Sequence, residues 1–170
     1  PFNAPPVANP DALTTPLNTP VTLNIVSNDT TPAGTINPAT VDLDPATPGI
    51  QKTITVPNQG TFVADPTTGA VTFTPVPGFI GVAKTPYTVQ NSAGDISNPA
   101  DITVTVQGAT ITGHVFTDTN GNGAQDVGEL SLPNVPVVIT TSDNKTITVN
   151  TNQNGDYSAV VPLGSTTANV

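Results

Sequence analysis

Short runs in which threonine alternates with valine, isoleucine or leucine recur along the chain, and turn residues separate them. Valine, isoleucine and threonine are branched at Cβ and favour extended strands, and an alternation with a period of two turns one face of a strand towards a core. The 19 prolines and 14 glycines interrupt these runs too often for a long amphipathic helix. We therefore predict an all-β protein.

The composition leaves few side chains for catalysis or for binding polyanions. The chain has one histidine, no cysteine and only three basic residues against twelve acidic ones. Thiol chemistry is therefore excluded, and so is a basic surface for nucleic acid or an anionic membrane. His114 lies in a predicted strand, belongs to no recognisable constellation and is predicted to be a surface residue. We predict that the chain is not an enzyme, does not bind nucleic acid and does not insert into a membrane.

Two changes in composition divide the chain. Residues 1–10 (PFNAPPVANP) hold four prolines and are predicted to form a stiff, Pro-rich linker. A strongly alternating run ends at Gln107, and a new run starts at Thr110. We therefore predict a first domain over residues 11–107 and a second over residues 108–170, joined by a short linker.

The first domain is predicted to contain about seven short strands separated by turn residues. Such a pattern over about 100 residues is typical of a β-sandwich. The segment Asp65–Gly69 lies between two alternating runs and is predicted to be a hairpin connection. The predicted strands are residues 21–26, 40–43, 52–56, 60–64, 70–74, 83–90 and 102–107.

Two further features of the first domain each admit two interpretations. Phe62, Phe73 and Phe79 alternate with polar neighbours and are predicted to be core residues, with a sugar-stacking surface as the alternative. Asp11 and the pair Asn28-Asp29 could ligate calcium at a domain junction. A turn capped by side chains is the simpler interpretation of that pair.

An ordered series of motifs runs through the first domain. They are PVTLNIVSNDT (20–30), ATVDL (39–43), VPNQGTF (56–62), TGAVTFTP (68–75), PGFIG (77–81), YTV (87–89) and ITVTV (102–106). Together they resemble the CshA-type fibril repeat of bacterial surface fibrils, and bacterial cadherin-like, Ig-like repeats share part of them. The resemblance covers nearly all of residues 7–107. It implies one bead of a tandem array that projects an adhesin tip away from the cell.

The most specific motif of the chain lies in the second domain. Residues 118–129 (DTNGNGAQDVGE) match the calcium-loop pattern D-x-[DN]-x-[DN]-G-x5-E throughout, and the last position holds the only glutamate of the chain. Calcium takes six to eight oxygen ligands, and the glycine at position 6 permits the sharp turn of such a loop. We predict bound Ca²⁺ here. The predicted ligands are Asp118, Asn120, Asn122, the backbone carbonyl of Ala124, Asp126 and Glu129.

Predicted strands at residues 111–116 and 132–141 flank this loop, where an EF-hand has helices. The segments GHVFTD (113–118), LPNVPVV (132–138) and NGDY (154–157), together with the loop, resemble the SdrD B-like repeat of bacterial surface proteins. This resemblance covers about residues 109–170 and implies a calcium-binding sandwich related to prealbumin-like domains. The chain ends at Val170, so this second domain could be truncated.

Other asparagines of the second domain repeat a spacing of two. They are Asn150, Asn152 and Asn154, followed by Asp156. The family often holds further calcium ions, but no later glutamate follows these residues. A two-residue Asn-Gly hairpin turn at residues 154–155 explains the spacing better than a second calcium site.

These observations predict a structural segment of a bacterial cell-surface fibril or adhesin. Two Ig-like and prealbumin-like β-sandwiches in tandem would form a spacer stiffened by calcium, extracellular and secreted. Its partners would be neighbouring repeats of the same or of identical chains, while other domains hold a host or environmental ligand. The alternatives are the repeating subunit of a polymerising extracellular filament and a ligand- or glycan-binding module of a secreted protein.

Overall fold

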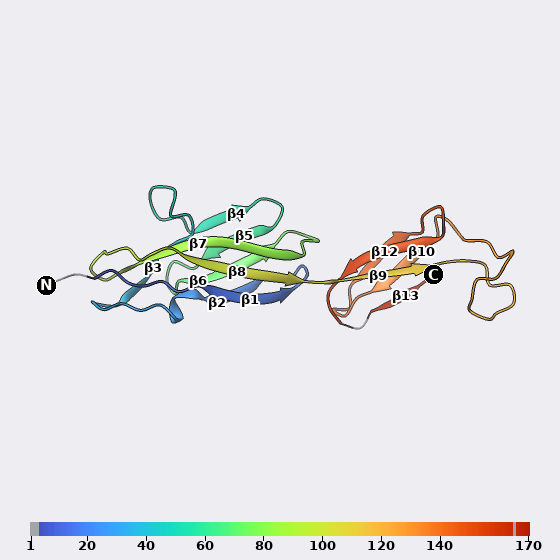
Figure 1. Ribbon diagram of the computed structural model, residues 1–170, viewed down its shortest axis with the longest axis horizontal. Helices are drawn as coiled ribbons and strands as arrows, with labels where there is room; N and C mark the ends of the chain where they lie inside the picture. The colour runs from blue at the N-terminus through green and yellow to red at the C-terminus, as the bar shows by residue number, and fades with distance from the viewer. Residues whose placement is uncertain (1–3, 165) are drawn as a thin grey trace. The chain divides into compact units, whose positions relative to one another are not determined.

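The computed structural model describes residues 4–164 and 166–170. Its regular elements are β-strands apart from one three-residue 3-10 turn, η1 (Ile25–Ser27). The chain divides into two compact units, Pro1–Gln107 (unit 1) and Gly108–Val170 (unit 2) (Figure 1). Each unit has its own cluster of buried apolar side chains. The predicted all-β fold is confirmed.

Unit 1 consists of two four-stranded sheets with the orders β1-β8-β7-β3 and β2-β6-β5-β4. The two outer strands of the first sheet run in the same direction, because β1 pairs with β8 in parallel, while β8 with β7 and β7 with β3 are two successive antiparallel pairs. The strands are β1 (Asp11–Pro16), β2 (Val21–Asn24), β3 (Ile36–Asp42), β4 (Thr53–Val56), β5 (Gly60–Ala64), β6 (Ala70–Pro75), β7 (Gly81–Asn91) and β8 (Ala100–Gln107).

Alternation along the strands builds the core of unit 1. In β8, Ile102, Val104 and Val106 are buried, whereas the intervening threonines are only half-buried. Phe62 and Phe73 are also buried, and their ring centroids lie 4.5 Å apart. The remaining phenylalanine of the three predicted core residues, Phe79, is partly buried against the same core.

The predicted linker over residues 1–10 lies partly outside the described residues. Residues 4–10 do not form a free connector but pack on unit 1, so this part of the prediction is wrong. Val7 N donates to Thr30 O at 2.7 Å, and the Ala8 side chain is 2 % exposed and belongs to the core. Pro6 and Ala8 are buried, and their burial together with the backbone bond of Val7 holds the segment on unit 1.

Most predicted strands of unit 1 are present with shifted ends. The predicted strand 21–26 stops at Asn24, where η1 begins, and the predicted strand 40–43 is the end of the longer β3. The hairpin between β5 and β6 is confirmed: Asp65 Oδ1 accepts the N–H groups of Thr67 and Thr68 at 2.8 and 2.7 Å.

Gly60 illustrates how closely the two hairpin strands approach. A Cβ atom at this position would lie 2.4 Å from Thr74 O and 2.6 Å from the Phe73 ring. We expect Gly60→Ala to lower the free energy of unfolding of unit 1 by about 1–3 kcal/mol, because overpacking must displace backbone or a core ring. Chemical denaturation measures this loss. An unchanged midpoint would mean that the hairpin is looser than these distances require.

Unit 2 is built from a three-stranded sheet, order β11-β10-β13, and a two-stranded sheet, order β12-β9. Val137, Ile139, Ala159 and Val161 are its buried apolar residues. The predicted strand 111–116 ends earlier than expected, and 132–141 starts later. The strands are β9 (Ala109–His114), β10 (Pro136–Thr140), β11 (Thr146–Asn150), β12 (Asp156–Val161) and β13 (Thr167–Asn169).

The turn before β12 differs from the predicted Asn-Gly hairpin. Gly155 has a φ of +83°, but Asn154 is not among the residues of positive φ, and a type I′ turn needs both. Gly155 N donates to Asn152 O at 3.0 Å instead. The turn therefore has Gln153 and Asn154 at its centre, and it joins β11 of one sheet to β12 of the other.

Candidate metal centre

The loop of residues 118–129 extends from unit 2 between β9 and β10 (Figure 1). A pair of facing backbone segments closes it at its base. Thr117 N donates to Leu130 O at 2.9 Å, and Leu130 N donates to Thr117 Oγ1 at 2.9 Å. These two hydrogen bonds hold the first and last residues of the loop, Asp118 and Glu129, close to each other.

Asp118 organises the first half of the loop through backbone N–H groups. Its Oδ1 accepts Gly121 N at 2.7 Å and Asn122 N at 3.1 Å, and its Oδ2 accepts Gly123 N at 2.9 Å. Gly123 has a φ of +76°, and a Cβ atom there would meet nothing within 4 Å. Glycine is therefore favoured at this position by the backbone conformation and not by lack of space.

Asp126 receives the side-chain amides of both loop asparagines. Asn120 Nδ2 and Asn122 Nδ2 donate to its Oδ2 at 2.8 and 2.7 Å. These two bonds, that of Asn120 first, hold the pKa of the Asp126 carboxyl below its ordinary value. The amide oxygen of Asn122 accepts Ala124 N at 2.7 Å, so the side chains at loop positions 3, 5 and 9 form one connected group.

Glu129 connects the two halves of the loop. Its Oε1 accepts Thr119 N at 2.8 Å, and its Oε2 accepts Asp126 N at 3.0 Å. Glu129 N donates back to Asp126 O at 3.1 Å. The single glutamate of the chain thus bonds backbone from both halves with its two carboxylate oxygens.

The six predicted ligand residues therefore lie in one closed loop, and their donor atoms fit a hard cation. The potential ligand atoms of the three carboxylates, two carboxamides and one backbone carbonyl are all oxygens, which calcium prefers. Residues 118–129 contain no lysine or arginine to neutralise the three carboxylates. Over residues 4–164 and 166–170, no three His, Asp or Glu side chains stand together at metal-binding distance. The carboxylates are turned onto N–H groups of the loop, so ligation requires them to give up part of these bonds.

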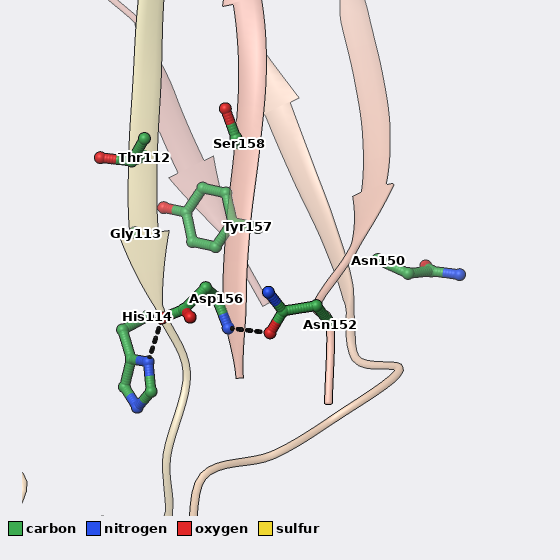
Figure 2. A pocket seen from close by; sticks show the side chains of 8 residues that line it. All are labelled: Thr112, Gly113, His114, Asn150, Asn152, Asp156, Tyr157 and Ser158. Carbon is green, nitrogen blue, oxygen red and sulfur yellow. Dashed lines mark hydrogen bonds and ion pairs between the residues drawn. The ribbon is translucent and has the colours of Figure 1, made fainter. Parts of the chain in front are cut away.

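His114 belongs to a constellation that the sequence prediction missed. Its Nδ1 lies 2.7 Å from Asp156 Oδ1, and its Nε2 lies 3.1 Å from Ser131 Oγ; Figure 2 shows the contact with Asp156. With Nδ1–H donating to the carboxylate, Nε2 accepts the hydroxyl proton of Ser131. The three residues are 17 and 42 positions apart, so no local pattern could reveal that they meet.

Two hollows flank His114, but Ser131 lines neither of them. A groove of about 690 Å³ lies over β9 and β12 (Figure 2), and a smaller one of about 240 Å³ lies on the side of Val137. A Cβ atom on Gly155 would stand 3.0 Å from Ser131 Cβ. The order of the bonds is that of a nucleophile, base and acid, but Ser131 lies outside the linings of both hollows.

In unit 1, the alternative site at Asp11 and Asn28-Asp29 is a turn capped by side chains. Asn28 Nδ2 donates to Asp11 Oδ1 at 3.2 Å. Asp29 Oδ1 accepts Asn9 N at 2.8 Å and the Tyr87 hydroxyl at 2.8 Å. These bonds fix the start of β1 beside the end of η1.

Comparison with known families assigns both units. A family described as bacterial Ig domain matches residues 3–107. The chain belongs to this family. The SdrD B-like domain family matches residues 109–160, so the bacterial Ig domain is followed by a segment similar to a second surface-protein module. No curated protein matches the chain. The solved D00-D0 domain of intimin is 14% identical, over 91% of this chain and 81% of that one, with a TM-score of 0.34.

The two family matches identify a module of bacterial surface proteins. Bacterial Ig domains and their neighbours in such proteins are typically structural and not enzymatic. In the part of the chain that the structure describes, no helix is long and apolar enough to span a membrane.

Proposed function

We propose that this chain is a structural segment of a bacterial surface fibril or adhesin. The CshA-type motifs support this role for the bacterial Ig domain of residues 3–107, and the similarity to SdrD B-like domains supports it for unit 2. The segment acts as an extracellular spacer. Its contacts are with neighbouring repeats of the same or of identical chains, and a host or environmental ligand is bound by other domains.

We further propose that calcium binding at residues 118–129 stabilises unit 2. The observation that carries this proposal is the closure of the loop by Glu129, whose carboxylate bonds Thr119 N and Asp126 N. Bound calcium would supply a positive charge that neutralises three carboxylates in a segment without basic residues. The residues that would hold it are Asp118, Asn120, Asn122, the carbonyl of Ala124, Asp126 and Glu129.

The chain's own contribution is to keep these ligand residues together on one closed loop. The backbone N–H groups that Asp118 and Glu129 accept hold the carboxylates on the loop, and the asparagine amides keep Asp126 ionised. Two of the side-chain ligands are neutral asparagines. Ligand charge sets calcium affinity, so we expect a dissociation constant in the range of extracellular modules, about 0.1–1 mM.

Thermal unfolding with calcium or chelator tests this proposal. With about 2 mM calcium, binding at that affinity adds roughly 1 kcal/mol to the stability of unit 2, which is a rise of about 4–8 °C in its Tm. We expect Glu129→Gln to abolish this rise, since the amide cannot bind calcium with two charged oxygens. Differential scanning calorimetry resolves the transition of each unit.

A matched control changes one charge of unit 2 outside the loop. Asp143 pairs with Lys145 in the turn between β10 and β11, so Asp143→Asn should alter the Tm in chelator but leave the calcium-induced rise intact. An equal rise in wild type and Glu129→Gln would refute calcium binding by this loop.

A further inference from the structure

The side chain of Gln125 reaches out of the loop to Ser131, which follows the loop. It occupies position 8 of the loop and is not among the predicted ligands. Its Nε2 donates to Glu129 O at 3.1 Å and to Ser131 Oγ at 3.2 Å. One amide group therefore holds the backbone of the closing glutamate and the serine that follows the loop.

The bonds continue from Ser131 into the strand pair β9–β12. Ser131 Oγ–H donates to His114 Nε2 at 3.1 Å, and His114 Nδ1–H donates to Asp156 Oδ1 at 2.7 Å. The imidazole also lies against the Phe116 ring, with centroids 5.9 Å apart.

Asp156 is itself fixed by the turn before β12. Its N–H donates to Asn152 Oδ1 at 3.0 Å, as Figure 2 shows. Every hydrogen of the series has an acceptor: the amide of Gln125 donates twice, the hydroxyl of Ser131 once and the imidazole once. With His114 Nδ1–H donating to Asp156, one arrangement of hydrogens satisfies every group of the series.

We infer that Gln125, Ser131 and His114 form a relay that holds Glu129 in position from the sheet, and that this relay sets the calcium affinity of the loop. Glu129 can bond Thr119 N and Asp126 N together only while its backbone stays in place. Gln125 and its partners are positioning residues, because none of them supplies a predicted ligand oxygen. The second half of the inference rests on the proposed calcium binding, whereas the first half does not.

The first half is tested without metal by hydrogen exchange. In excess chelator, the amide hydrogens of Thr119 and Asp126 are expected to exchange several-fold faster in Gln125→Ala and in Ser131→Ala than in wild type. Exchange of the β10 and β11 amides should stay unchanged, because a general loss of stability would accelerate those as well. Unchanged exchange at Thr119 and Asp126 in both variants would overturn the relay.

Matched controls come from the same unit. Gln153→Ala removes an exposed glutamine from the turn before β12, and Ser158→Ala removes an exposed serine from β12. They remove a carboxamide and a hydroxyl, as Gln125→Ala and Ser131→Ala do, but from residues outside the relay. They should exchange like wild type at Thr119 and Asp126.

Calcium titration by calorimetry on the full chain tests the second half. One neutral hydrogen bond corresponds to about a fivefold change in an equilibrium constant. Gln125→Ala and Ser131→Ala are therefore expected to weaken calcium binding about fivefold or more, with the Tm in chelator within about 2 °C of the Gln153→Ala and Ser158→Ala controls.

The Glu129→Gln variant distinguishes failure of the proposed calcium binding from failure of the relay. If Glu129→Gln binds calcium as wild type does, or if wild type does not bind, the proposed calcium binding by this loop is wrong, and the exchange experiment alone decides the positioning of Glu129. If Glu129→Gln loses binding while Gln125→Ala and Ser131→Ala match their controls, the loop binds calcium and the relay does not set its affinity.

Discussion

Replacing Phe62 with alanine is expected to lower the free energy of unfolding of unit 1 by about 3–5 kcal/mol. Phe62 is fully buried in β5, and its ring contacts Phe73 of β6 at a centroid distance of 4.5 Å. Truncation removes this contact and leaves a cavity between the two sheets that rigid strands fill poorly. Calorimetry of the full chain measures the shift of each transition.

The same experiment tests whether the two units unfold independently. Because each unit has a separate apolar cluster, the transition of unit 2 should keep its Tm in Phe62→Ala. Phe79→Ala is the control, since Phe79 is only partly buried against the same core and should cost less. If both transitions fell together in Phe62→Ala, the units would be one cooperative block and the division into two domains would be wrong.

The parts of the fold that sequence predicts are those encoded locally. The strand of residues 60–64 and the turn at Asp65–Gly69 follow from alternation and from an aspartate that caps its own turn. The strand β1 is not predicted, because it is stabilised by parallel pairing with β8, where Asp11 lies opposite Ile102. Residues so distant in sequence leave no periodic signal that joins them.

In the candidate site, too, the part encoded by contiguous residues can be predicted from the sequence and the part formed by distant residues cannot. The loop of residues 118–129 is recognisable because all its oxygen donors are contiguous, and the base that closes it also lies beside it in sequence. The relay is not recognisable, because Ser131 meets His114 through the bridge between Phe116 and Ser131, and Asp156 meets it through the pairing of β9 with β12. His114 is exposed, as predicted, but its hydrogen-bond partners become known only once the fold brings Ser131 and Asp156 to it.

A buried pair of acids in unit 1 produces the second large expected effect. Asp11 is 8% exposed, and Asp29 is half-buried beside it. Within residues 4–164 and 166–170, Oδ2 of each carboxylate is buried without a hydrogen-bond partner. Burial first, and then the charge of Asp29, raises the pKa of Asp11 from an ordinary 3.8 to about 6. Burial also raises the pKa of Asp29.

The direction of the pH dependence follows from these shifts. The folded chain binds the proton of Asp11 more tightly than the unfolded chain does, so protonation favours folding. The contribution is complete below the ordinary pKa near 3.8 and is lost as the pH rises through about 6. Asp29 acts in the same sense. We therefore expect the Tm of unit 1 to rise, not fall, when the pH is lowered from 7.5 to about 5.

Asp11→Asn should reproduce this gain at neutral pH. Removing a charge whose pKa is raised by about two units adds about 3 kcal/mol to the free energy of unfolding of unit 1 at pH 7.5. The amide oxygen of the variant can still accept the bond from Asn28 Nδ2. Urea denaturation at pH 7.5 and pH 5 measures both values, and the variant should show a smaller difference between them than wild type, the remainder coming from Asp29.

Asp101→Asn is the matched control, because Asp101 lies in β8 of the same sheet but pairs with Lys84 at the surface. Such an exposed ion pair contributes about 0–1 kcal/mol to the free energy of unfolding. The Asp101→Asn variant should therefore not gain stability at pH 7.5. The opposite result for Asp11→Asn, a loss of stability at pH 7.5, would mean that the ionised carboxylate is a net stabiliser.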